Sequence, residues 1–233
     1  MGIPPKKMTV TGNLKFDTHF EKLTPSEKNY FRDELGISSH DRVVTIGSTH
    51  VQEEERLLKQ LEPLWKEIPN LKLLLVPRHP ERFQEVAILL KKMNIPSISY
   101  STRKSCNQRE KVVLIDAMGL LPTCYQLAEV ALVGGSFVKG VGGHNIFEPI
   151  QCGVPVLFGM HMESQRDFAD LILRAMAGRQ LTLDELPEAL KELLQNGGMR
   201  AHMTACGKKL TQSAQGAIAR TWESFTPLLA NIR

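Results

Sequence analysis

From residue 42 onward the chain alternates short apolar, β-branched runs with longer amphipathic segments, and this alternation limits the folds open to it. Strand and helix in repeated succession are typical of a parallel sheet with right-handed crossover helices. The runs that predict buried strands are 42–48, 71–76, 97–100, 112–115, 130–133 and 154–158. We therefore predict an α/β fold, a Rossmann-like doubly wound parallel sheet.

The segments between and after the predicted strands have helical periodicity. In residues 52–68, for example, Leu57, Leu61 and Leu64 recur on one face. The expected helices are 52–68, 81–93, 121–129, 164–177, 183–194 and a long stretch over 199–229. Residues 1–40 do not follow the alternation, although 25–35 predict a helix with Thr24 as its N-cap. We interpret 1–40 as a connector and lead-in, and 41–233 as one Rossmann-like domain.

Composition excludes several classes of protein. The 233 residues carry 29 Lys and Arg against 25 Asp and Glu, a net charge of +4 without a dense basic run, so nucleic acid is not an expected partner. The four cysteines form no CxxC pair, which argues against a zinc site or a disulfide framework and favours a reducing compartment. We expect no signal peptide and no membrane-spanning segment.

Polar or glycine-rich residues follow five of the predicted strands. In a doubly wound sheet, ligands bind at the carboxyl ends of the strands, which all lie at one edge. The sequences at these ends are GSTH (47–50), PRHP (77–80), DAMG (116–119), GGS (134–136) and GMH (159–161). Five such ends at one edge predict a binding cleft.

The densest of these segments is GGSFVKGVGGHNIFEP, residues 134–149, with five glycines in its first ten positions. Glycine lets the backbone approach a phosphate closely, and we expect a helix beginning at His144 or Asn145 to point its positive end at an anion. The alternative is a flexible loop before an ordinary capped helix. The segment is not a GxxxxGK[ST] P-loop, nor a GxGxxG fingerprint after the first strand.

Side chains near these ends suit an anionic ligand. Arg78 could pair with a phosphate or carboxylate in a bidentate manner, or could bond a carboxylate on a helix at the surface. His79 could bind an anion or pack in its loop, and Glu148 could accept hydrogen bonds from ribose hydroxyls or complement a helix dipole. His50 precedes three glutamates whose spacing does not suit a metal, so we interpret them as an acid-rich helix start. No nucleophile and base occur as a recognisable pair.

Seven motifs in register resemble the Kdo (3-deoxy-D-manno-octulosonic acid) transferase family over essentially the whole chain. They are GNLKFD (12–17), STH (48–50), VPRHPERF (76–83), DAMG (116–119), GGSF (134–137), GGHNIFEP (142–149) and GVPVLFGMH (153–161). The family has the GT-B architecture, in which two Rossmann-like domains face a cleft. The resemblance implies that this chain is the C-terminal half, which binds CMP-Kdo. It also implies that the N-terminal domain, with the acceptor site and the general base, is absent from it.

The resemblance further implies inverting transfer of Kdo to a lipid A precursor in lipopolysaccharide biosynthesis, without a metal or cofactor. The fragment alone is expected to be inactive and to contain no catalytic residue. The full-length enzyme is expected to associate peripherally with the cytoplasmic face of the bacterial inner membrane, while the fragment is expected to be soluble. The implied donor-binding residues are Ser48, Arg78, His79, Met118, Gly119, Gly134, Gly135, Ser136, Gly142, Gly143, His144, Asn145 and Glu148.

Two other functions remain open from the sequence. The chain could belong to another GT-B transferase or epimerase that acts on a UDP-sugar, in which case a pyrophosphate donor would be preferred over CMP. It could also be a non-catalytic nucleotide-binding or interaction module.

Overall fold

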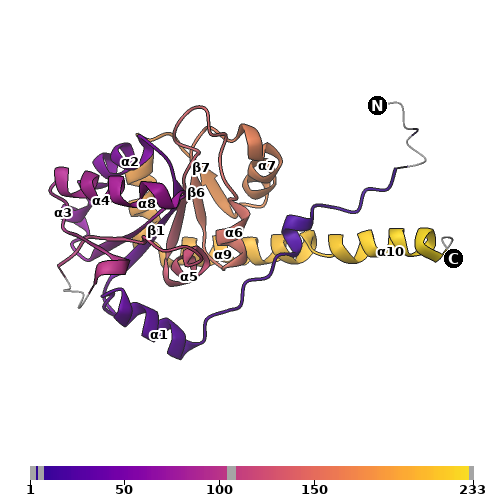
Figure 1. Ribbon diagram of the computed structural model, residues 1–233, viewed down its shortest axis with the longest axis horizontal. Helices are drawn as coiled ribbons and strands as arrows, with labels where there is room; N and C mark the ends of the chain where they lie inside the picture. Colours follow the sequence, from indigo (N-terminus) through magenta and orange to yellow (C-terminus); the bar gives the residue numbers. More distant parts are fainter. Residues whose placement is uncertain (1–3, 5–7, 104–108, 231–233) are drawn as a thin grey trace.

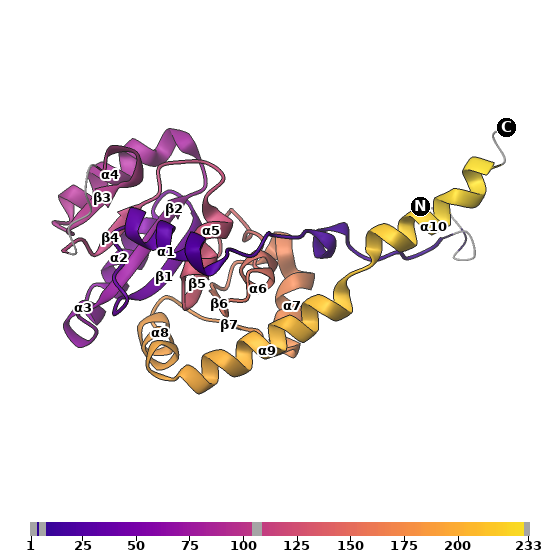
Figure 2. The ribbon, with the colours of Figure 1, turned by 90° about the horizontal axis from the view of Figure 1, so that it is seen from below.

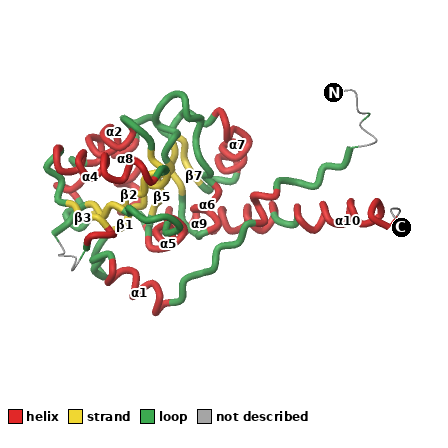
Figure 3. Tube along the Cα trace, in the orientation of Figure 1, coloured by secondary structure: helices red, strands yellow, loops and turns green. Residues whose placement is uncertain are grey.

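A computed structural model describes residues 4, 8–103 and 109–230. Seven parallel strands form one sheet in the order β3-β4-β2-β1-β5-β6-β7. The strands are β1 (Arg42–Thr49), β2 (Leu71–Pro77), β3 (Ser97–Ser99), β4 (Val112–Leu114), β5 (Val130–Val133), β6 (Val156–Phe158) and β7 (Gly178–Gln180). Figures 1 and 3 show helices on both sides of this sheet, so the predicted doubly wound α/β fold is confirmed.

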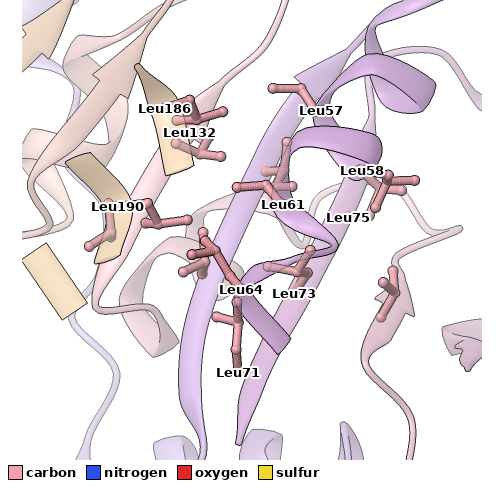
Figure 4. Packing of buried hydrophobic residues seen from close by; sticks show 14 of the residues in the cluster. Leu57, Leu58, Leu61, Leu64, Leu71, Leu73, Leu75, Leu132, Leu186 and Leu190 are labelled. Carbon is pink, nitrogen blue, oxygen red and sulfur yellow. The ribbon is translucent and has the colours of Figure 1, made fainter. Parts of the chain in front are cut away.

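Alternate side chains of the strands enter opposite faces of the sheet. On one face, apolar side chains of β1, β2 and β5 and their neighbours pack under helices α2, α3, α4 and α8, as Figure 4 shows for Leu57, Leu61 and Leu73. The other face is covered by α1, α5, α6, α7 and α9. The helices are α1 (Pro25–Glu34), α2 (Glu53–Leu61), α3 (Leu64–Glu67), α4 (Phe83–Lys92), α5 (Leu121–Leu127), α6 (Phe147–Gln151), α7 (Arg166–Arg174), α8 (Leu186–Gln195), α9 (Gly197–Ala214) and α10 (Ala217–Ala230).

Two predicted helices are divided and one strand was missed. The expected helix 52–68 breaks before Leu64, where Pro63 cannot donate the backbone hydrogen bond that continues a helix. The expected stretch 199–229 breaks at Gly216, whose φ of +95° lies outside the helical region. β7 escaped prediction because its three residues, Gly178 to Gln180, have no apolar pattern. The N-cap at Thr24 is confirmed, since Thr24 and Glu27 form a capping box.

The connector lies against the start of α10, and α10 extends away from the sheet (Figure 1 and Figure 2). The Asp17 carboxylate accepts the backbone N–H groups of Gly216 at 2.6 Å and Ile218 at 2.5 Å, and Arg220 Nε donates to the Thr11 carbonyl at 2.9 Å. The domain boundary at residue 40 stays a prediction.

Two further predictions concern cysteines and membrane spans. Cys124, Cys152 and Cys206 are free, while Cys106 lies outside the described residues. Among the helices of the described residues, none is both long enough and apolar enough to cross a bilayer.

Candidate functional site

The strand order reverses between β1 and β5, and this position governs where a ligand binds. β1 pairs with β2 on one side and with β5 on the other. The loops that follow β1 and β5 therefore diverge and leave a crevice between them. Gly134 N donates to the Gly47 carbonyl at 2.8 Å, which joins the two strand ends. A Cβ on Gly134 would lie 2.7 Å from the Ser48 carbonyl oxygen, so only glycine allows this close approach.

Arg78 and His79 follow β2 at the same edge. Arg78 N donates to the Thr49 carbonyl at 3.1 Å, while its guanidinium is exposed and has no ion-pair partner in the described part of the chain. The His79 ring lies 5.3 Å from the His50 ring, edge to face. The structure therefore brings a free guanidinium and two imidazoles together at the crevice.

His50 and His144 form a close pair across the crevice. Their Nε2 atoms are 2.6 Å apart and their rings stack with centroids 4.8 Å apart, so one imidazole donates and the other accepts. Burial, followed by the charges of His50, Arg78 and His79, lowers the pKa of His144 to about 4. Burial and then His79 also lower the pKa of His50. Both rings are thus neutral donors or acceptors at neutral pH.

The low pKa of His144 predicts that acid destabilises the fold through this residue. Between its ordinary pKa of 6.5 and about 4, the unfolded chain binds a proton that the folded chain does not, so stability falls as pH is lowered through this interval. Urea unfolding near pH 7 and near pH 5 should therefore show a larger loss of stability for the wild type than for His144→Gln. Equal losses in the two proteins would contradict the assignment.

Glu53, at the start of α2, is completely buried and holds the glycine-rich loop. Its carboxylate accepts backbone N–H groups from Gly135 at 2.7 Å, Phe137 at 2.9 Å and His50 at 3.1 Å. Burial raises the pKa of Glu53, and these three hydrogen bonds oppose the rise. The N–H groups of Gly135 and Phe137 are therefore already bonded to Glu53.

Glu54 is equally buried but faces a different partner. Its carboxylate pairs with the Arg82 guanidinium and accepts a hydrogen bond from Thr49 Oγ1 at 2.9 Å. Interpreting residues 53–55 as an acid-rich helix start was therefore incomplete, because two of the three carboxylates lie inside the protein and organise the strand ends. Sequence reasoning missed both residues.

The glycine-rich loop folds back on itself before α6. Gly135 has a φ of +68°, and its carbonyl accepts the N–H of Gly143 at 2.9 Å. The predicted helix start at His144 or Asn145 is wrong, because α6 begins at Phe147. Asn145 still acts near the start, since its Oδ1 accepts the Phe147 N–H at 3.1 Å.

The remaining candidate residues lie around this loop. Ser136 is fully buried, and its hydroxyl donates to the Val133 carbonyl at 2.6 Å and accepts the Gly159 N–H at 2.7 Å. Ser48 is half-buried in the left-handed region, with a φ of +57°. Met118 and Gly119 follow β4, two strands away from β1, and Met118 is 62% exposed.

Glu148 lies in α6 beside these groups. Burial raises the pKa of its carboxyl, and the Arg78 charge opposes that rise. Within residues 8–103 and 109–230 no hydrogen-bond donor reaches this carboxylate, so it is free to accept one from a ligand. Those residues also contain no group of three His, Cys, Asp or Glu side chains able to hold a metal ion.

A cleft of about 600 Å³ adjoins the His50–His144 pair. It runs between the start of α2 and the loop after β5, and its lining includes His50, Arg56, Phe137, Lys139, Val141 and His161. Arg78 and Glu148 do not line it. The edge of the sheet therefore carries a crevice with Arg78 and Glu148 and, next to it, a second hollow.

The chain is similar in sequence and in fold to known glycosyltransferases. No family model matches the chain. It is 36% identical over 226 residues to a 3-deoxy-D-manno-octulosonic acid transferase of Chlamydophila psittaci, covering 97% of this chain and 51% of that protein. It is 35% identical over 232 residues to the transferase of the same description in Haemophilus influenzae, covering 98% and 53%. The chain spans about half the length of the curated relatives it matches.

Solved structures agree on the fold. The C-terminal CMP-Kdo binding domain of WaaA from Acinetobacter baumannii superimposes with a TM-score of 0.75 at 29% identity, covering 80% of this chain and 97% of that one. Anabaena HepE, crystallised with UDP-glucose, has a TM-score of 0.62 at 14% identity, a likeness of fold alone. The chain is therefore similar, over nearly its whole length, to about half the length of 3-deoxy-D-manno-octulosonic acid (Kdo) transferases, and its Rossmann-like fold matches that of a C-terminal CMP-Kdo binding domain.

Proposed function

We propose that the chain is the donor-binding domain of a Kdo transferase and binds CMP-Kdo for inverting transfer of Kdo to a lipid A precursor in lipopolysaccharide biosynthesis. One observation carries the proposal: the Arg78 guanidinium, the His144 imidazole and the Glu148 carboxylate converge at the crevice where the strand order reverses. The similarity to Kdo transferases and to a CMP-Kdo binding domain supports it.

The single phosphate of the donor would bind beside Arg78. A guanidinium without an internal partner can form two parallel hydrogen bonds to a phosphate, and its charge stabilises the negative charge that grows on CMP as the sugar leaves. His79 and the His50–His144 pair lie close enough to donate further hydrogen bonds. No metal or cofactor is needed in this scheme, because the cationic side chain performs the neutralisation.

The nucleoside would lie toward α6 and the end of β4. The Glu148 carboxylate is the group best suited to the ribose hydroxyls, because it is largely buried and its acceptors are free. Ser48, Asn145, Met118 and Gly119 would complete the nucleoside site. Gly134, Gly135, Ser136, Gly142 and Gly143 would shape the wall facing the phosphate.

The rest of the reaction belongs to the whole transferase. We expect the acceptor and the general base to be supplied by the half of the relatives that this chain does not match. We expect the whole transferase to associate peripherally with the cytoplasmic face of the bacterial inner membrane. This chain alone should therefore bind the donor without turning it over.

Calorimetric titration with CMP and UDP tests the proposal. We expect CMP to bind more tightly than UDP, and Arg78→Ala to weaken CMP binding by about 10-fold to 100-fold, the value of a lost charge-assisted hydrogen bond. Arg174→Ala is the control, because Arg174 is an exposed arginine at the far end of α7.

Each other outcome favours a different function. Preference for UDP would favour a UDP-sugar transferase or epimerase, the alternative with which the HepE fold is compatible. A folded protein that binds neither nucleotide would favour a non-catalytic interaction module. An equal effect of Arg78→Ala and Arg174→Ala would remove Arg78 from the site.

A further inference from the structure

The cleft next to the His50–His144 pair has the chemistry of an acid-binding pocket. Its volume of about 600 Å³ is ample for a sugar, and Phe137, Val138 and Val141 supply an apolar wall. Arg56 of α2 and Lys139 of the glycine-rich loop stand at its polar side together with His161. Among the described residues that line it, none is an aspartate or a glutamate.

The two cations of this cleft have no internal partner in the described residues, whereas the four glutamates next to its lining residues are engaged elsewhere. Glu53 accepts three backbone N–H groups, and Glu54 pairs with Arg82. Glu55 pairs with Lys59 at 2.6 Å, and Glu163 lies 3.5 Å from His161. Arg56 and Lys139 thus leave uncompensated positive charge beside a cavity, which favours an anionic occupant.

His50 lies between the cleft and the crevice that holds Arg78. His50 lines the cleft and also contacts His144 through Nε2 and His79 through its ring. A nucleotide whose phosphate lies beside these histidines would therefore extend the group esterified to that phosphate into the cleft. In a nucleotide-activated sugar acid of the ulosonic type, this group carries a carboxylate on its anomeric carbon.

We propose that the Arg56–Lys139 cleft binds the carboxylate of the donor's acidic sugar and makes the domain selective for sugar acids over neutral sugars. This inference rests on the proposed function and adds two specificity-determining residues to it. A neutral hexose would leave both cations without a counter-charge, whereas a carboxylate between them gains charge-assisted hydrogen bonds. The cleft lies apart from Arg78 and Glu148, so CMP itself would not need it.

Titration of CMP and CMP-Kdo into the wild type and an Arg56→Gln/Lys139→Gln double variant tests this assignment. We expect the wild type to bind CMP-Kdo at least about 10-fold more tightly than CMP. In the double variant this preference should disappear, while the affinity for CMP stays within about 2-fold of the wild type. Lys91→Gln/Arg174→Gln is the matched control, because it makes the same change in net charge at exposed positions far from the cleft.

The outcomes separate this inference from the proposed function. A wild type that binds CMP and CMP-Kdo equally would overturn the inference and leave the nucleotide site in place. A double variant that loses CMP and CMP-Kdo affinity in equal proportion would also overturn it, because the cations would then serve the nucleotide. A folded wild type that binds neither ligand would overturn both proposals.

Discussion

Arg82→Ala is expected to lower the free energy of unfolding by about 3–5 kcal/mol, the usual cost of leaving one member of a buried ion pair alone. The Glu54 side chain is 1% exposed and that of Arg82 is 11% exposed, so water cannot replace the lost guanidinium. Glu54 would keep only the hydrogen bond from Thr49. Urea unfolding monitored by circular dichroism measures the loss.

Two further variants isolate the cause of that loss. Arg179→Ala removes an arginine from an exposed pair with Glu192, whose side chains are 33% and 44% exposed, and should cost no more than about 1 kcal/mol. Arg82→Ala combined with Glu54→Gln should recover part of the stability, because the buried charge is then gone. A loss below about 1 kcal/mol in Arg82→Ala would contradict a buried pair.

Glu53→Gln is expected to weaken CMP binding by about 10-fold or more and to destabilise the fold by about 2–3 kcal/mol. The carboxylate accepts three backbone N–H groups, whereas glutamine offers one oxygen and a donor NH₂. At least one N–H among those of His50, Gly135 and Phe137 would then face another donor. The loop that carries these atoms would move away from the end of β1.

Glu55→Gln is the control for this prediction. Glu55 lies in the same helix and pairs with Lys59 at the surface, so its substitution should leave CMP affinity unchanged. Calorimetry measures the affinity, and the amide proton resonances of Gly135 and Phe137 report the hydrogen bonds directly. Unchanged amide resonances in Glu53→Gln would show that Glu53 does not position the loop.

The fold could be predicted because its strands are buried on both faces. The runs 43–46 and 71–76 are apolar apart from Thr45 and Lys72, and glycine, proline or polar residues follow them. β7 could not be predicted because it is short and its place depends on pairing with β6, with Gly178 opposite Val156, which only the folded sheet supplies. The helix break before Leu64 could have been predicted from the sequence, because Pro63 stands directly before it.

Only the part of the candidate site that lies at the strand ends could be predicted from the sequence. Arg78, His144 and Glu148 do converge, although whether they bind a nucleotide stays a prediction. Glu53 escaped prediction because an acid at a helix start is usually solvated, and its bonds to Gly135 and Phe137 join residues 82 and 84 positions away. Three consecutive glutamates that follow a strand end after three intervening residues were the available signal, and this signal did not distinguish buried from exposed carboxylates.

The bond between Asp17 and the start of α10 has a mechanical consequence. Its two hydrogen bonds join Asp17 to Gly216 and Ile218, 199 and 201 positions along the chain, so that the whole seven-stranded sheet lies between the joined residues. Tension applied through the connector and α10 would act first on these two hydrogen bonds and on the contact between Arg220 and Thr11. We expect the parallel strands to bear tension only after these contacts break. Force applied at the two ends would then be transmitted through Asp17 and α10 without deforming the crevice.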